Sequence, residues 1–129
     1  MNKRKTGAFY EEAAAEYLKT AGCRILERNF RSRTGEIDII IKDPAGTICF
    51  VEVKYRQSER YGHPEEAVGP AKQRTICRTA RYYLLCSRLW RLAEEGRIRI
   101  RFDVIAISGD PAEKRESIRW FKDAFPYQA

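Results

Sequence analysis

The stretch GEIDIIIKDPAGTICFVEVKYR, residues 35–56, constrains the fold more than any other part of the sequence. Its two runs rich in Ile and Val, at 36–42 and 47–55, are typical of buried β-strands. Between them lies Asp43-Pro44-Ala45-Gly46. Proline favours the first central position of a type I turn, and glycine supplies the left-handed residue that follows, so these residues predict a three-residue β-hairpin.

This turn type also predicts the register of the two strands. It pairs Asp43 with Thr47, and it then sets Asp38 opposite Glu52. Opposed residues share a face of the sheet. One face is expected to be apolar, with Ile37, Ile39, Ile41, Cys49, Val51 and Val53. The other is expected to gather charges at the end away from the turn, with Glu36 opposite Lys54 beside Asp38 and Glu52.

The charged face predicts a metal site. Two carboxylates that face each other in a partly buried place repel one another, and a cation removes the repulsion. Carboxylate oxygens suit Mg²⁺ or Mn²⁺. Lys54 lies two residues after Glu52 and reaches the same site, where an ammonium group can orient a water molecule or stabilise a phosphate. The hypothesis is phosphodiester hydrolysis at Asp38, Glu52 and Lys54. The alternative is a structural ion-pair network at the end of a sheet.

The remaining sequence predicts helices and strands around the hairpin. Gly22 is typical of the residue that follows a helix, Pro70 of a first helical position, and Gly96 of a helix stop. Helices are predicted at 7–21 and 70–94, strands at 23–31, 97–107 and 117–125, and a polar loop at 56–69. The order α-β-β-β-α-β-β predicts an α/β fold with a mixed β-sheet flanked by helices, as one domain over residues 1–129.

Composition narrows the class of partner. The 129 residues include 25 Lys and Arg against 18 Asp and Glu, a net charge of +7. This excess favours nucleic acid or an anionic membrane surface, or it is simply a solvated surface. No segment has the length of a membrane span, and the N-terminus lacks the apolar run of a signal peptide, so a cytoplasmic protein without membrane contact is expected.

Basic residues flank the predicted site on both sides. They are expected to contact nucleic-acid phosphates without reading the sequence, and the first helical turn after Pro70 can add backbone amide donors. The candidates are Arg31, Arg33, Arg56, Lys72, Gln73 and Arg74. Further along this helix, Arg78 and Arg81 favour a solvated face or an oligomer contact. Leu85, Leu89 and Leu92 are candidate contacts of a homodimer.

The same residues resemble a known family. GEIDII (35–40), FVEVKYR (50–56), EEAAAEYLKTAG (11–22) with ILERNFR (25–31), and RFDVIAI (101–107) are similar to the YraN family of small bacterial proteins. That family resembles the archaeal Holliday-junction resolvases, and both are placed in the PD-(D/E)xK nuclease superfamily. The resemblance implies a restriction-endonuclease-like core, consisting of a helix, a three-strand meander, a second helix and a further strand.

The resemblance also implies roles for particular residues. Asp38 and Glu52 correspond to the two acidic metal ligands and Lys54 to the lysine of the superfamily motif, with the Val53 carbonyl as a third ligand. Glu11 matches the helix glutamate that supports the metal site in resolvase-like members. Helical spacing independently places Glu11 beside the apolar stripe, whereas Glu12 lies in the middle of the polar face. Glu36 belongs to the GEID motif without an assigned role.

The sequence is therefore consistent with three functions. The first is a Mg²⁺- or Mn²⁺-dependent DNA endonuclease, a hydrolase acting on branched or damaged DNA in repair or recombination. The second is a nucleic-acid-binding module that retains the nuclease fold without catalysis. The third is an interaction protein whose charged cluster is structural.

Overall fold

The computed structural model describes residues 3–56, 68–110 and 115–129. Its elements are α1 (Lys3–Thr20), β1 (Arg24–Ser32), β2 (Gly35–Lys42), β3 (Ile48–Arg56), α3 (Pro70–Cys86), α4 (Trp90–Glu94), β4 (Ile100–Asp110) and β5 (Arg115–Phe125). Apart from the short α4, this is the expected order α-β-β-β-α-β-β, and the predicted α/β class is confirmed.

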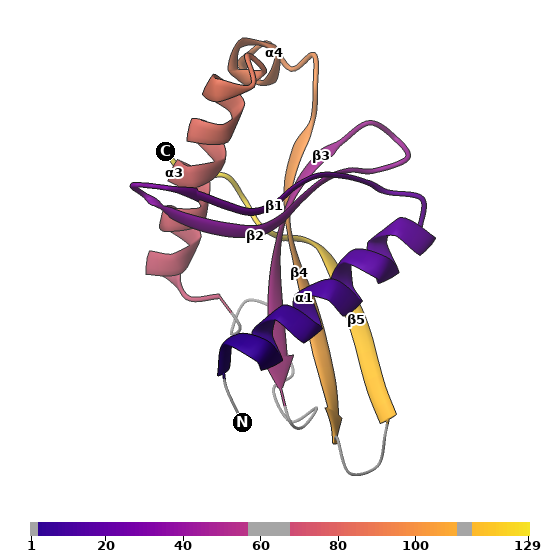
Figure 1. The fold of residues 1–129 in the computed structure, drawn as a ribbon. Coiled ribbons are helices and arrows are strands. Elements are labelled where there is room, and N and C mark those ends of the chain that lie inside the picture. The colour runs from indigo at the N-terminus through magenta and orange to yellow at the C-terminus, as the bar shows by residue number, and fades with distance from the viewer. Residues whose placement is uncertain (1–2, 57–67, 111–114) are drawn as a thin grey trace.

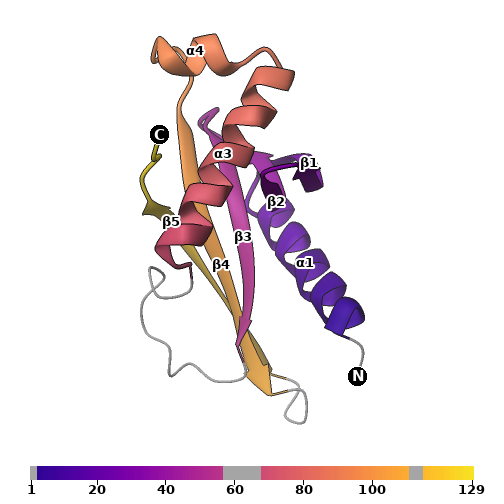
Figure 2. The ribbon, with the colours of Figure 1, turned by 90° about the vertical axis from the view of Figure 1, so that its left-hand side faces the viewer.

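The strands form one five-stranded mixed sheet in the order β1-β2-β3-β4-β5. β3 and β4 pair in parallel, and the other neighbours pair antiparallel. Helix α1 lies on one face of the sheet and α3 on the other (Figures 1 and 2). A parallel pair needs a crossover connection, and α3 belongs to the connection between β3 and β4.

Each face of the sheet has its own apolar core. On the α1 side, Leu18 packs with Ile39 and Ile105 in a fully buried cluster. On the α3 side, Phe50 and Ile76 belong to a second cluster. Burying a Leu, Ile or Phe side chain contributes about 1.5–3 kcal/mol. The central strands are therefore apolar on both faces for most of their length, and Glu52 of β3 and Asp103 of β4 are buried charged exceptions.

The turn between β2 and β3 has the predicted conformation. The Asp43 amide donates to the Thr47 carbonyl at 2.9 Å, and Gly46 is left-handed, with φ 91°. The Asp43 side chain also accepts the Thr47 amide at 2.9 Å. The predicted register is confirmed where the ladder exists, because Ile40 pairs with Phe50.

The pairing of β2 with β3 ends earlier than expected, and the sheet forks there. The ladder runs no further from the turn than Ile39 and Val51, and the β1–β2 pair then turns across the other strands (Figure 1). Asn29 of β1 is left-handed, with φ 53°, and lies across from this point. The expectation that Ile37 shares a face with Ile39 is wrong, because the turned strand packs Ile37 into the α3-side cluster.

The long helix predicted at 70–94 is two helices. α3 ends with paired hydrogen bonds in which the Leu89 amide donates to Leu84 at 2.8 Å and the Arg88 amide to Leu85 at 3.2 Å. This Schellman motif places its left-handed residue at Arg88, with φ 60°. The chain then turns into α4, and β4 begins at Ile100 rather than at residue 97.

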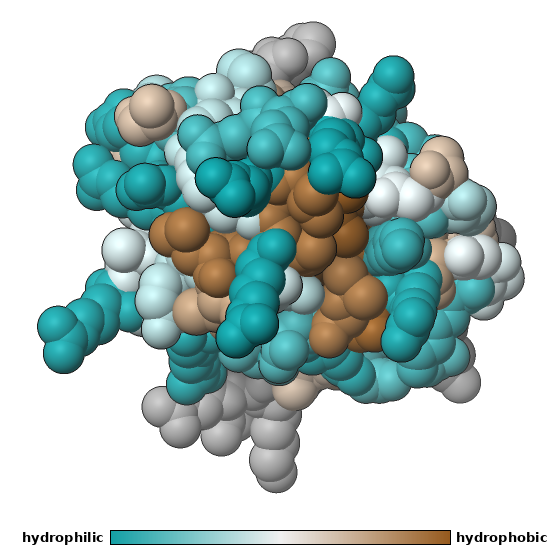
Figure 3. Space-filling model, turned by 90° about the horizontal axis from the view of Figure 1, so that it is seen from above, coloured by the Kyte–Doolittle hydropathy of each residue, from teal (hydrophilic) through white to brown (hydrophobic). Residues whose placement is uncertain are grey.

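The end of the molecule that carries α4 exposes apolar side chains. Figure 3 looks onto this end and shows brown apolar atoms gathered among teal hydrophilic ones. Leu85 is exposed, whereas Leu89 and Leu92 are half-buried. The homodimer stays a prediction. Within residues 3–56, 68–110 and 115–129, no helix is both long and apolar enough to cross a membrane.

Candidate metal centre

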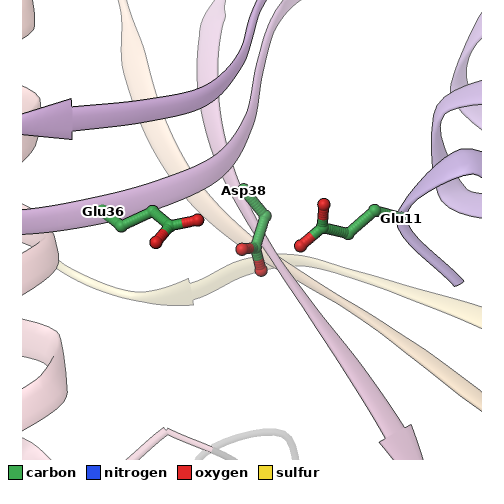
Figure 4. A group of neighbouring side chains, drawn as sticks. All are labelled: Glu11, Glu36 and Asp38. Atoms are coloured by element: carbon green, nitrogen blue, oxygen red, sulfur yellow. The ribbon is translucent and has the colours of Figure 1, made fainter. Parts of the chain in front are cut away.

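Three carboxylates meet where the sheet forks. Glu11 comes from α1, and Glu36 and Asp38 come from β2 (Figure 4). One carboxylate oxygen of each lies within 4.8 Å of the others, and all three residues are half-buried. These residues are called the acidic cluster below. It forms because the turned end of β2 carries its charged residues toward the N-terminal half of α1.

Helix α1 selects Glu11 by its rotation on the sheet. Ala14 and Leu18 are fully buried against the strands, and Glu11 lies at the edge of this apolar stripe. Glu12, one residue further round the helix, is exposed and accepts a hydrogen bond from Arg28 at 2.7 Å. The predicted choice of Glu11 over Glu12 as the inward-reaching glutamate is confirmed.

Asp38 is held in place by the neighbouring strand. Its Oδ2 accepts a hydrogen bond from the backbone amide of Val53 at 2.8 Å. Burial raises the pKa of Asp38, the Val53 amide lowers it, and the negative charge of Glu36 raises it again. Burial and then Asp38 raise the pKa of Glu11. The cluster therefore carries more negative charge than its surroundings stabilise, a condition that a cation relieves.

Glu52 lies beside the cluster with two lysines. Its Oε1 is 3.8 Å from the Lys54 Nζ and 3.7 Å from the Lys72 Nζ. Burial and then the charge of Asp38 raise the pKa of this carboxyl to about 7, against the lowering effect of the two lysines. Lys72 comes from the first turn of α3, so the two lysines reach the same oxygen from different elements.

The acidic cluster differs in one residue from the carboxylates that the sequence predicted as metal-site residues. Glu36 joins Asp38 and Glu11 within 4.8 Å, whereas Glu52 acts on Asp38 electrostatically from outside this group. The hairpin register predicted Glu36 on the same charged face as Asp38, without an assigned role. The roles of Glu52 and of the Val53 carbonyl as metal ligands stay predictions.

Gly35 explains how the β1–β2 hairpin approaches α3. A Cβ atom at Gly35 would lie 2.5 Å from the Thr75 Cγ2, so only glycine fits here without a shift. The Thr34 and Thr79 hydroxyls share a hydrogen bond at 2.9 Å. This contact docks the hairpin on α3 directly before Glu36.

The predicted phosphate contacts have different surroundings. Arg31 lies 3.5 Å from Glu36, and Lys72 pairs with Glu52. Arg33 and Arg74 are exposed. The Gln73 amide group is engaged, because it donates to the Val68 carbonyl at 2.8 Å and accepts from Gln128 at 2.9 Å. The Arg56 side chain lies outside the described residues.

Asp103, the other buried carboxylate, has a structural environment. Both of its oxygens accept hydrogen bonds from Arg101, at 2.8 and 2.9 Å. Trp120 and the Asp123 amide donate to it at 2.9 Å each. The pKa of Arg101 is raised by this pairing. Four hydrogen-bond donors therefore stabilise the Asp103 carboxylate without a cation.

The acidic cluster, by contrast, fits a hard divalent cation. It offers carboxylate oxygens from two elements, and the Glu52 carboxyl lies beside it. Mg²⁺ takes one or two protein carboxylates and keeps waters, and Mn²⁺ accepts the same oxygen donors. Among the described residues, no other group of three His, Cys, Asp or Glu side chains offers ligand atoms this close together.

Comparison with known proteins places the chain in a family. The model of the uncharacterised protein family UPF0102 matches residues 10–107. A UPF0102 protein of Syntrophus aciditrophicus is 49% identical over 121 residues, covering 94% of this chain and 88% of that protein. A UPF0102 protein of Lachnoclostridium phytofermentans is 45% identical over 125 residues, covering 97% and 96%.

Among solved structures, Pyrococcus furiosus SfsA in complex with Ca²⁺ has a TM-score of 0.38 and 19% identity, covering 93% of this chain and 63% of that one. The family match and the two relatives confirm the resemblance to the YraN proteins. The chain belongs to the uncharacterised protein family UPF0102.

Proposed function

We propose that this protein is a Mg²⁺- or Mn²⁺-dependent DNA endonuclease that hydrolyses phosphodiester bonds in branched or damaged DNA. The observation that carries the proposal is the acidic cluster with Glu52 and its two lysines alongside. Carboxylates for a cation next to ammonium groups for a phosphate are the combination that phosphodiester hydrolysis needs. The net charge of +7 supports a polyanionic substrate.

Asp38 is the central residue of the proposed site, with Glu11 and Glu36 around it and Glu52 as the predicted further ligand. A bound Mg²⁺ or Mn²⁺ supplies Lewis-acid polarisation of the phosphate and lowers the pKa of a bound water. The Val53 amide keeps the Asp38 carboxylate oriented toward the cluster.

The two lysines act on the substrate. Lys54 and Lys72 lie within 4 Å of the same Glu52 oxygen, which keeps both ammonium groups at the site before substrate arrives. They donate hydrogen bonds to the scissile phosphate, and Lys54 orients the attacking water. Arg31, Arg33 and Arg74 hold the backbone on either side, which positions DNA without reading its sequence.

Calorimetric titration with Mn²⁺ tests the metal site. Asp38→Asn and Glu11→Gln remove ligand charge at nearly constant shape and are expected to weaken Mn²⁺ binding at least about tenfold, on the scale of one lost charged contact. Glu12→Gln is the matched control, because it removes an exposed glutamate one position away. Equal Mn²⁺ affinity in all four proteins would contradict the metal site.

Cleavage assays then test the reaction. Labelled junction, flap, single-stranded and duplex DNA are incubated with Mn²⁺ and with the wild type, Asp38→Asn or Lys54→Ala. The wild type is expected to cut at least one substrate and both variants to lose the activity. Cutting that survives Asp38→Asn would place the activity elsewhere. DNA binding without cleavage of any substrate would favour the non-catalytic nucleic-acid-binding module.

A further inference from the structure

A groove of about 640 Å³ lies along the outer face of α3 and shares no residue with the acidic cluster. Its volume is within the roughly 300–1,000 Å³ that is common for ligand sites. The residues that matter for its chemistry are Arg78, Arg81, Tyr82, Leu85, Trp90 and Tyr127. Thr34, at the tip of the β1–β2 hairpin, closes one side.

Aromatic rings in this groove are exposed and yet held in place. Tyr82 is 48% exposed and Tyr127 is 38% exposed. The Tyr82 ring packs against Phe30, with centroids 6.1 Å apart, and the Tyr127 ring lies 6.1 Å from that of Trp90. Rings fixed from behind and open in front are platforms on which a planar group can stack with little loss of side-chain freedom.

The groove also has two arginines in its lining, together with Gln128 and Ala129 at the end of the sequence. Arg78 and Arg81 line it, and no Asp or Glu side chain does. In the part of the chain that the structure describes, neither arginine forms an ion pair, and Arg81 instead lies 5.1 Å from the centre of the Trp90 ring. Their guanidinium groups are therefore available to an anion, and arginine suits phosphate in particular.

We propose that this groove binds an unpaired nucleotide of single-stranded nucleic acid. Aromatic platforms for the base together with arginines for the phosphate are the usual means of holding a single strand without reading its sequence. A duplex would not use the groove, because its bases are stacked and paired and cannot reach the rings. Charge complementarity favours this occupant over a second copy of the same basic chain.

The groove lies near enough to the acidic cluster for one DNA strand to reach both, an inference that rests on the proposed function. Thr34 borders the groove, and Glu36 follows two residues later in the same hairpin. Lys72 and Arg78 are separated by six residues of α3, about 9 Å along the helix axis. A strand that leaves the cluster can pass round the hairpin tip into the groove. The substrate class is then DNA with a single-stranded flank beside the cut.

Binding is measured by fluorescence anisotropy with a labelled thymidine oligonucleotide and with a duplex of equal length. EDTA is present, so that no cleavage occurs. Tyr82→Ala and Arg81→Ala are expected to weaken binding of the single strand about fivefold or more, the low end of what one stacked base contributes. Tyr82→Phe keeps the ring and is expected to bind like the wild type. Arg91→Ala is the charge-matched control, because Arg91 is 89% exposed in α4 and is expected to have no effect beyond twofold.

Tryptophan fluorescence locates the bound strand. The chain has two tryptophans, and Trp90 lines the groove. The oligonucleotide is expected to quench the wild type and to leave Trp90→Phe nearly unquenched at the same concentration. Quenching that persists in Trp90→Phe would place the strand elsewhere and overturn the proposal.

Two further results would also overturn it. One is single-strand affinity in Tyr82→Ala and Arg81→Ala equal to that of Arg91→Ala. The other is a dimer, seen by light scattering, that Tyr82→Ala dissociates, because a second copy would then occupy the groove. The binding measurements are all made in EDTA, without metal or cleavage, so they test the groove separately from the acidic cluster. If the wild type neither binds metal nor cleaves DNA but still binds the oligonucleotide in the groove, the proposed function is contradicted and the proposal for the groove is not.

Discussion

Asp103 and Glu52 are both buried carboxylates, but they differ in what surrounds them. Asp103 accepts hydrogen bonds from Arg101, Trp120 and the Asp123 amide, which satisfy it completely. Glu52 has two lysines at nearly 4 Å and the charge of Asp38 nearby. The hydrogen bonds around Asp103 stabilise the fold. The surroundings of Glu52 leave its ionised form unfavourable unless a further positive charge lies close to it.

The pH dependence of stability is expected to report on Glu52. Burial raises its pKa from 4.5 in the unfolded chain to about 7, so the folded chain binds this proton more tightly. The protonated Glu52 carboxyl therefore stabilises the folded chain. This contribution to the free energy of unfolding is fully present below pH 4.5 and is lost as the pH rises through 7. Urea titrations without divalent ions measure this effect. Between pH 5 and pH 8, the free energy of unfolding of the wild type is expected to fall by about 2 kcal/mol more than that of Glu52→Gln.

Glu12→Gln is the control for this titration. It is expected to follow the wild type because the hydrogen bond from Arg28 lowers the pKa of Glu12 from 4.5, so this carboxylate stays ionised from pH 5 to pH 8. If wild type and Glu52→Gln lose stability in parallel, the Glu52 carboxyl is already ionised at pH 5 in the folded chain.

At the scale of elements, the three helix ends show what sequence can and cannot reveal. α1 ends at a left-handed Gly22, α4 at a left-handed Gly96, and α3 at a left-handed Arg88. Glycine adopts this conformation without cost, so the first two ends were predictable. Arginine adopts it far less readily, and no glycine in the sequence marks the end of α3.

The β2–β3 hairpin was also predictable only in part. Pro44 and Gly46 specify the turn, and the turn specifies the register near it. The fork beyond Ile39 was not predictable, because it depends on how α1 and α3 dock on opposite faces of a twisted sheet. The hairpin register predicted Asp38 and Glu36 on one charged face, and helical periodicity with family resemblance predicted Glu11. The approach of Lys72 to Glu52, by contrast, required the tertiary fold.

Docking of the β1–β2 hairpin on α3 is expected to depend on Gly35. Gly35→Ala would place a methyl group 2.5 Å from the Thr75 Cγ2, and overpacking of this kind costs about 1–3 kcal/mol of unfolding free energy. Thr75→Ala removes the opposing methyl group, so the double variant is expected to regain the part of the loss that comes from this contact. The positive φ of Gly35, 153°, keeps the remaining strain in both Gly35 variants. Urea titrations of the four proteins form a double-mutant cycle. Additive losses in the double variant would mean that the two residues do not meet.

For the whole molecule, the distribution of charge decides which interactions are sensitive to salt. The acidic cluster lies in a chain of net charge +7, in which Arg33 and Arg74 are exposed. Phosphate contacts release counterions, so their strength falls with ionic strength, whereas a stacked base is less affected. The two proposed sites are thus separable by salt as well as by substitution.

DNA binding measured as a function of salt tests this separation. Arg74→Ala is expected to weaken binding for every sequence and to make the slope of log K against log salt shallower by about one. Arg97→Ala removes an equally charged residue that pairs with Glu95, and it is expected to leave the slope unchanged. An unchanged slope in Arg74→Ala would show that Arg74 makes no phosphate contact.

The hydrogen bond from the Val53 amide to Asp38 has a consequence for ion selectivity. An aspartate tethered to the main chain of the next strand cannot rotate freely, so its orientation is settled before any ion enters. A rigid oxygen donor discriminates among ions by radius, since Mg²⁺ demands short, regular coordination and Ca²⁺ accepts longer and more variable distances. By anchoring one carboxylate to its own backbone, β3 would make the stiffness of the sheet a determinant of which cation the proposed metal site prefers.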